Sequence, residues 1–278
     1  MKFIYACDIH GDKNKYEKLF QKAKEENIKY IVLGGDLLPK RGVRKIIQPE
    51  FIKDYLEDYF KKLNENDINC ILIPGNDDLE RFDIQINEFC KKYPNIYNID
   101  EKRLDIEDVS FIGLSKVLDH PFSSKNRVVV EEDLKMEPQL SEDIYIKKDT
   151  EVITIEEWKE YRETHVEKME DVLTNLPNAD RDRKVIYVLH DPPYGVGLDA
   201  CANGLQVGSK AITKFLEGSD SYMSLHGHIH ESPKISGLWF NKLGRTTCIQ
   251  PGQTELGENE CYYVLIDTEL ETKSRHEM

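Results

Sequence analysis

Short apolar runs alternate with amphipathic stretches in the first third of the chain. Residues 2–7, 30–33 and 70–73 are apolar runs with the length of a buried strand. Between them, residues 13–26 and 49–66 carry apolar side chains at helical spacing. Strands that alternate with helices in this way predict right-handed βαβ units and a largely parallel core.

The middle of the chain has a different pattern. Residues 103–107 and 109–113 have the pattern of the two arms of a hairpin. The polar stretch 115–153 shows no hydrophobic periodicity that indicates a helix or a strand. Residues 155–175, in contrast, predict one long, charged, amphipathic helix.

Strand-like runs return in the last third of the chain, together with a predicted helix over residues 209–216. The predicted strands cover residues 184–189, 221–225, 235–240, 246–250 and 261–267. Because no repeat or low-complexity linker interrupts the chain, we expect one domain over residues 1–278, with an insertion around residues 115–175.

Composition and charge limit the possible partners. Hydrophobic residues make up 39% of the chain, enough for a substantial core, and no apolar run approaches the roughly 18 residues that span a bilayer. The formal net charge of −14 gives an acidic surface that repels polyanions and disfavours nucleic acid. A small anionic substrate stays compatible, because bound metal ions reverse the local field.

The cysteines and the N-terminus indicate a cytoplasmic protein. The six cysteines form no CxxC pair, and several lie in apolar runs, so we expect reduced, buried thiols. The first apolar run leads directly into Asp8 and His10 and not into a signal-peptide cleavage site.

Five polar motifs follow predicted strands, where ligands bind in open α/β sheets. They are Asp8-Ile9-His10, Gly35-Asp36, Gly75-Asn76-Asp77-Asp78, His190 and Gly227-His228-Ile229-His230. In the D-x-H and H-x-H motifs, residues i and i+2 of an extended segment point to the same side. Seven such ligands exceed the needs of one ion, but two ions that share a bridging carboxylate would use them all.

These motifs carry a resemblance to a known family. The series DIHGD, GGD, GND, LHDPP and GHIH, from residue 8 to residue 230, resembles the calcineurin-like metallophosphoesterase superfamily. LHDPP, GHIH and the later Gln250-Pro251-Gly252 are most similar to small prokaryotic phosphodiesterase-type members. The resemblance implies an α/β fold of two β-sheets packed face to face with helices on the outer faces, a four-layer α/β/β/α sandwich.

The resemblance also implies how the ligands are shared between two divalent ions. One ion would take Asp8, His10 and His230, the second would take Asn76, His190 and His228, and Asp36 would bridge them. Imidazole and carboxylate ligands suit Mn, Fe, Zn, Ni or Co. The implied activity is hydrolysis of a small phosphoester by metal-activated water, with Asp36, Asn76 and His190 as the catalytic residues.

One position departs from the family pattern. Many members have histidine after the asparagine, placed to protonate the leaving oxygen, and here Asp77 stands in that place. Nearby dications favour an ionised carboxylate, so Asp77 is a poor acid and has the features of a turn residue. His120 is a candidate replacement for the acid, and Arg41 is a candidate contact for the phosphate; the alternative for both is a surface role.

Three functions are compatible with these motifs. Hydrolysis of small phosphodiesters is the leading interpretation. The alternatives are a phosphomonoesterase on nucleotides or sugar phosphates, and a non-catalytic protein-binding scaffold on the same fold. The scaffold alternative predicts eroded ligands, whereas all seven are present.

Overall fold

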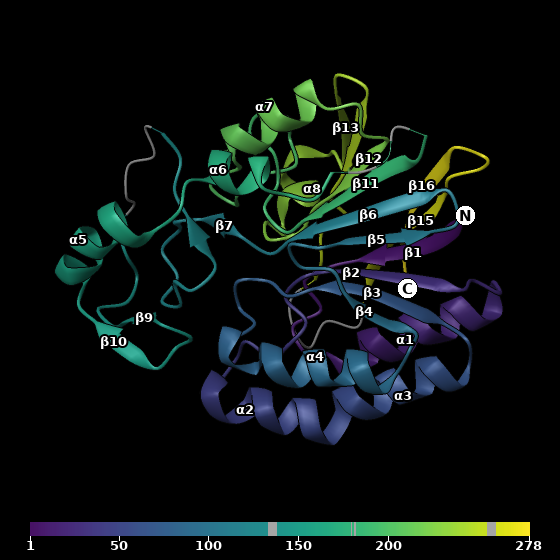
Figure 1. The fold of residues 1–278 in the computed structure, drawn as a ribbon, viewed down its shortest axis with the longest axis horizontal. Helices are drawn as coiled ribbons and strands as arrows, with labels where there is room; N and C mark the ends of the chain where they lie inside the picture. Colours follow the sequence, from purple (N-terminus) through teal and green to yellow (C-terminus); the bar gives the residue numbers. More distant parts are fainter. Residues whose placement is uncertain (133–137, 179, 181, 255–259) are drawn as a thin grey trace.

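Two mixed β-sheets pack against each other and are covered by helices on their outer faces (Figure 1). The computed structural model describes residues 1–132, 138–178, 180, 182–254 and 260–278. This architecture confirms the predicted four-layer α/β/β/α sandwich. Whether the whole chain is one domain stays a prediction.

The first sheet contains the N-terminal strands, and its order is β16-β15-β1-β2-β3-β4. The bounds are β1 Lys2–Ala6, β2 Tyr30–Gly34, β3 Asn69–Ile73, β4 Ile96–Asn98, β15 Tyr262–Asp267 and β16 Thr272–Glu277. β1 to β4 are parallel, as predicted, while β15 and β16 add an antiparallel edge. The helices that cover this sheet are α1 Lys13–Glu25, α2 Arg44–Phe51, α3 Glu57–Glu65 and α4 Asp83–Lys92.

The second sheet has the order β13-β14-β12-β11-β6-β5. The bounds are β5 Arg103–Ile106, β6 Val109–Leu114, β11 Lys184–Leu189, β12 Met223–Leu225, β13 Phe240–Leu243 and β14 Thr246–Ile249. The predicted hairpin is confirmed as β5 and β6, and β6, β11, β12 and β14 run parallel. The helices that pack on the outer side of this sheet are α6 Met169–Thr174 and α7 Lys210–Gly218. The short helix α8 Ser232–Ser236 follows the GHIH motif.

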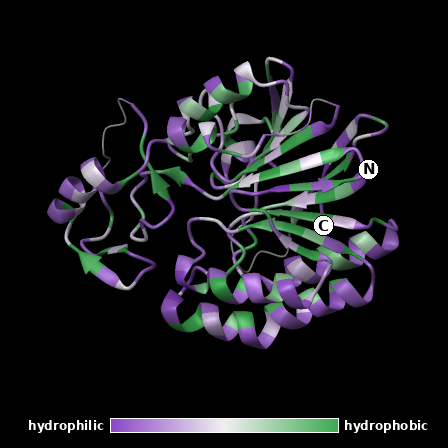
Figure 2. Ribbon diagram, viewed as in Figure 1, coloured by the Kyte–Doolittle hydropathy of each residue, from purple (hydrophilic) through white to green (hydrophobic). Residues whose placement is uncertain are grey.

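A buried apolar layer joins the two sheets. Phe3 of β1 meets Phe111 of β6 edge to face, with ring centroids 5.8 Å apart. Around them lie Val32 and Ile71 of the first sheet and Val188 of the second, all fully buried. The strands are apolar along most of their length, while the helices are polar on their outer sides (Figure 2). This layer packs the two sheets face to face.

The insertion extends away from the sandwich at the left of Figure 1. It contains β7 Val117–Leu118, β8 Val128–Val129, β9 Ile144–Ile146, β10 Glu151–Ile153 and α5 Ile155–His165. The predicted single helix 155–175 is wrong, because α5 ends at His165 and α6 begins at Met169. Val130 causes the break: its N–H donates to the carbonyl of Glu167 and its carbonyl accepts from the N–H of Met169, so this segment is extended.

Two other predicted boundaries differ from the structure. The helix predicted from residue 49 begins at Arg44, and its N-terminal part is held by Gln48, whose side chain binds Pro39 O, Asp77 O and Leu79 N. A π-helical segment, Ile52–Leu56, follows this helix. Residues 235–240, predicted as a strand, instead contain the end of α8 and the start of β13.

Within the described residues, no helix is both long enough and apolar enough to cross a membrane.

Candidate metal centre

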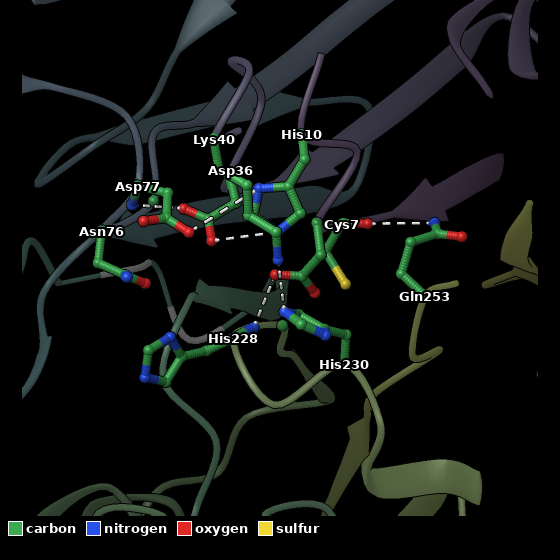
Figure 3. A network of polar contacts seen from close by, with 12 residues as sticks. Cys7, His10, Asp36, Lys40, Asn76, Asp77, His228, His230 and Gln253 are labelled. Carbon is green, nitrogen blue, oxygen red and sulfur yellow. Dashed lines mark hydrogen bonds and ion pairs between the residues drawn. The ribbon is translucent and has the colours of Figure 1, made fainter. Parts of the chain in front are cut away.

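The polar motifs gather where strands of both sheets end (Figure 3). Strands β1, β2 and β3 of the first sheet and β11 and β12 of the second each end just before one of the motifs. The predicted ligands lie on the loops that follow these strands: Asp8, His10, Asp36, Asn76, His190, His228 and His230. Residues more than 200 positions apart are therefore neighbours; the backbone N–H of His228 donates to Asp8 Oδ1 over 3.0 Å.

Asp8, His10 and Asp36 form one compact group. One ligand atom from each lies within 4.8 Å of the others, and all three residues are buried. His10 Nε2 is 3.7 Å from Asp36 Oδ2. Among the described residues, neither ring nitrogen of His10 nor Oδ2 of Asp8 has a hydrogen-bond partner. A buried polar atom without a partner costs about 1–3 kcal/mol. A bound cation would remove this cost by taking up the lone pairs of these atoms.

Asn76 and His190 form a second set of neighbours near Asp36. His190 Nε2 lies 3.2 Å from Asn76 Oδ1 and 3.6 Å from Asp36 Oδ2. The other ring nitrogen, Nδ1, donates to the carbonyl of Gly34 over 2.8 Å. This bond orients the ring and leaves Nε2 toward Asp36. His10 and His190 thus both lie next to the same oxygen of Asp36, which leaves its bridging role a prediction.

The two histidines of GHIH lie at the border of this site. The His230 ring is edge-on to that of His10 at 5.5 Å, and its Nε2 lies 3.3 Å from Lys40 Nζ. The His228 ring is 5.4 Å from that of His190. One ligand atom of His228 also lies within 4.8 Å of ligand atoms of His120 and Asp191, the second such group among the described residues.

The backbone around the candidate ligands is unusual. Asp8, His10, Asp36 and His228 have φ between 49° and 69°, in the left-handed region that residues other than glycine seldom adopt. Such conformations cost about 1–3 kcal/mol each and cluster at functional sites. Gly75 is required beside them, because a Cβ there would lie 2.2 Å from Asp36 Oδ1.

Burial and charge shift the pKa values of His10 and His190 in opposite directions. Burial lowers the pKa of His10 well below its usual value, against the opposing charge of Asp36, and so keeps the imidazole neutral. Burial alone would raise the pKa of Asp36, but the neighbouring His190 and His10 hold it below its usual range. Burial would likewise lower the pKa of His190, yet the Asp36 carboxylate raises it. The buried carboxylate of Asp36 therefore favours a positive charge next to it.

Asp77 is held by one predicted ligand, Asp36, and by one residue outside the ligand set, Arg44. Its backbone N–H donates to Asp36 Oδ1 over 2.8 Å, and its Oδ1 accepts from Nη1 of Arg44 over 2.9 Å. Burial, followed by the charge of Asp36, raises the pKa of Asp77 to about 6, while Arg44 opposes the shift. Arg41, the predicted phosphate contact, is exposed in the loop before α2.

Two supporting residues were not predicted as part of the site. The buried carboxylate of Asp78 accepts from the backbone N–H groups of Leu37, Leu38 and Gly75, and so ties the loop after β2 to the loop after β3. Gln250 donates from Nε2 to the carbonyls of Gly227 and Ile229, and so holds the GHIH turn. The only sequence signals were the second aspartate of GNDD and the Gln250-Pro251-Gly252 motif.

Comparisons with known proteins agree with this geometry. A family model described as calcineurin-like phosphoesterase matches residues 1–232. An uncharacterized protein of Methanocaldococcus jannaschii is 25% identical over 255 residues, which cover 90% of this chain and 88% of that protein.

Solved structures with low sequence identity share the fold. A protein of Thermus thermophilus has a TM-score of 0.60 at 19% identity, covering 99% of this chain and 97% of that chain. An archaeal phosphodiesterase has a TM-score of 0.51 at 13% identity, covering 100% of both chains. A dimetal phosphatase from Danio rerio has a TM-score of 0.52 at 10% identity, covering 96% of this chain and 94% of that chain.

Proposed function

The chain belongs to the calcineurin-like phosphoesterase family and is a metal-dependent phosphoester hydrolase, and from this premise we propose that it holds two divalent transition-metal ions and hydrolyses small phosphodiesters. The observation that carries the proposal is the buried group of Asp8, His10 and Asp36, whose donor atoms converge within 4.8 Å. Free oxygen and imidazole donors in this arrangement suit Mn, Fe, Co, Ni or Zn.

The ligand assignment is the one that the family resemblance implies, and the contacts around Asp36 support it. One ion would be held by Asp8, His10 and His230, and the second by Asn76, His190 and His228. Asp36 would bridge the two, which is supported by the distances of 3.7 Å from His10 and 3.6 Å from His190 to the same carboxylate oxygen. When bound, such a pair of ions polarises the phosphate and lowers the pKa of water that acts as the nucleophile.

The protein's own side chains orient the substrate and limit the chemistry. Lys40 is half-buried beside His230 and would supply a cation to a phosphate oxygen. Asp77 is held by Arg44 and takes the place where other family members carry a histidine acid. Esters whose leaving oxygen needs no proton are therefore the better substrates.

The choice of diesters over monoesters rests on charge. Near pH 7 a monoester carries close to two negative charges and a diester about one, and the net charge of −14 penalises the former more. The solved relatives include a phosphodiesterase and a dimetal phosphatase, so the fold accommodates both ester types. A phosphomonoesterase is accordingly the second candidate.

Metal analysis followed by a phosphoester panel tests the proposal. Purified protein should contain two transition-metal ions per chain after reconstitution with Mn²⁺ or Ni²⁺, and should then hydrolyse aryl phosphodiesters. Protein that binds no ion tightly and cleaves no ester in the panel would overturn it.

A further inference from the structure

A second group of polar residues includes the candidate ligand His228 and two of its neighbours. His120 comes from the insertion, Asp191 follows β11, and His228 follows β12; we refer to these three as the His228 support. One ligand atom from each lies within 4.8 Å of the others. Among the described residues, Oδ1 of Asp191 and Nε2 of His228 are both buried and have no hydrogen-bond partner. Two buried polar atoms that lack partners and belong to neighbouring side chains can satisfy each other.

The two oxygens of Asp191 have separate surroundings. Oδ2 accepts from the backbone N–H of Leu118 over 3.1 Å, which fixes the carboxylate against strand β7 of the insertion. The backbone carbonyl of Asp191 accepts from Nδ1 of the buried His226 over 3.0 Å. Both bonds hold the residue in place and leave Oδ1 available.

Aromatic rings restrict the rotation of His228. The ring of His120 stacks on it at a centroid distance of 5.5 Å, and the ring of Phe122 meets it edge-on at 6.1 Å. Since both residues belong to the insertion, this segment forms one wall around a candidate metal ligand. The insertion therefore contacts the metal centre through His228.

We propose that Asp191 is a positioning residue for the metal centre, accepting a hydrogen bond from Nε2–H of His228 while Nδ1 of that ring binds the second ion. The proposal rests on the proposed function, which makes His228 a ligand. A metal-bound histidine commonly donates its other ring N–H to a carboxylate, which fixes the tautomer and makes the ligand more basic. The rings of His120 and Phe122 contact His228 and limit its rotation.

Replacing Asp191 by Asn separates this role from a merely structural one. An asparagine keeps one carbonyl oxygen, which can still accept from Leu118 N, but it then presents an NH₂ group to His228 and cannot accept from Nε2–H. A structural role alone therefore predicts that D191N behaves as wild type. The positioning role predicts a loss of about 10–100-fold in affinity for one ion, the usual effect of removing such a partner.

The matched control is Asp199→Asn. Asp199 is also fully buried, its Oδ1 has no partner among the described residues, and its Oδ2 accepts from the N–H groups of Gly195 and Gly208. D199N removes the same charge from the same loop without facing His228. Dissociation constants for Mn²⁺ and Zn²⁺ are measured on the full chain by competition with a chromophoric chelator, beside the thermal midpoint of each metal-free protein.

The expected result is two ions in wild type, D199N and D191N alike, with one ion bound about 10–100-fold more weakly in D191N alone. Equal affinities in wild type and D191N would overturn the proposal while leaving the two-ion function intact. Loss of a whole ion from D191N, even at saturating metal, would also overturn it, because the His228 support would then itself be a cation site. A wild-type chain that binds fewer than two ions contradicts the proposed function first, and this inference with it.

Discussion

Arg44 donates from Nη1 to Oδ1 of Asp77 over 2.9 Å, so the position at which the family resemblance leads us to expect a histidine is occupied here by one partner of an ion pair. Nη2 of Arg44 also donates to Ser123 Oγ over 3.1 Å, which connects the pair to the insertion. Both side chains are mostly buried, with 18% and 22% of their surface exposed. Asp77 therefore forms an ion pair with Arg44, and a histidine at the same position could not form it.

The first prediction is that Asp77 and Arg44 are energetically coupled. A double-mutant cycle with Asp77→Ala and Arg44→Ala, measured by urea unfolding of metal-free protein, should give a coupling of about 0.5–3 kcal/mol. The exposed pair Lys147–Glu151, with 57% and 44% of its side-chain surface exposed, is the control and should give at most about 0.5 kcal/mol. Equal coupling in the two pairs would show that the Asp77 pair is an ordinary surface contact.

The second prediction concerns Asp36 as the shared ligand. Replacing Asp36 by Asn should lower the content of both ions, because His10 and His190 both lie next to the same Oδ2. Elemental analysis after dialysis against metal-free buffer measures the content. Asp105→Asn, on the surface beside Arg103, is the control and should retain the wild-type content. One tightly bound ion that persists in D36N would contradict the bridging assignment.

The third prediction concerns the ester type. With Mn²⁺ or Ni²⁺ bound, kcat/KM for a nitrophenyl phosphodiester should equal or exceed that for the matching monoester, because the acidic surface penalises the more highly charged substrate. Lys40→Met should reduce both activities and should reduce the monoester activity more. A strong monoester preference across several metals would instead favour the phosphomonoesterase alternative.

The fourth prediction concerns the thiols. Burial raises the pKa of Cys248 and of Cys261 to about 12, and Cys7 and Cys70 are likewise fully buried. Because the thiolate is the reactive form, these four should react with a disulfide reagent at about pH 8 only after unfolding. The half-buried Cys90 and Cys201 should react first. Rapid reaction of all six in native protein would contradict this burial.

The sequence predicted the parts of the molecule whose determinants are local. Apolar runs identified β1, β2, β3 and β11, and polar residues directly after them marked the edge where Asp8, Asp36 and His190 meet. The family resemblance supplied the packing of the two sheets, which the strand pattern alone did not contain. The family and the fold are confirmed, while the metal ligands stay a prediction that the geometry supports.

The parts that were wrong or missed depend on contacts between distant residues. The helix predicted over 155–175 is interrupted because Val130 pairs with the segment around Lys168. The apolar periodicity of residues 155–175 contains no signal of this pairing. The partner of Asp77 is 33 residues away in the chain. His120 lies in a segment without hydrophobic periodicity, so its stacking on the ring of His228 follows from the tertiary packing of the insertion and could not be predicted.

The last prediction tests what holds the insertion together. Nζ of Lys125 donates to Asp119 Oδ1 over 2.8 Å, and neither side chain has any exposed surface. Trp158 Nε1 donates to the other oxygen of Asp119 over 3.2 Å, and Nε of Arg162 lies 2.8 Å from it, so one buried carboxylate joins the 119–125 segment to α5. Removing one partner of a buried pair typically costs about 3–5 kcal/mol, since it leaves an uncompensated charge.

Lys125→Met should therefore destabilise the protein by about 3 kcal/mol, at the lower end of this range because Arg162 still compensates Asp119. Lys147→Met, in an exposed pair of the same insertion, should change the stability by less than about 0.5 kcal/mol. Urea unfolding measures both, and limited proteolysis shows where the chain opens.

Since Leu118, His120 and Phe122 of the insertion contact Asp191 or His228, cleavage of K125M between residues 119 and 168 should be accompanied by weaker metal binding. A K125M protein that is readily cleaved there but binds both ions as tightly as wild type would show that the insertion does not support the metal centre.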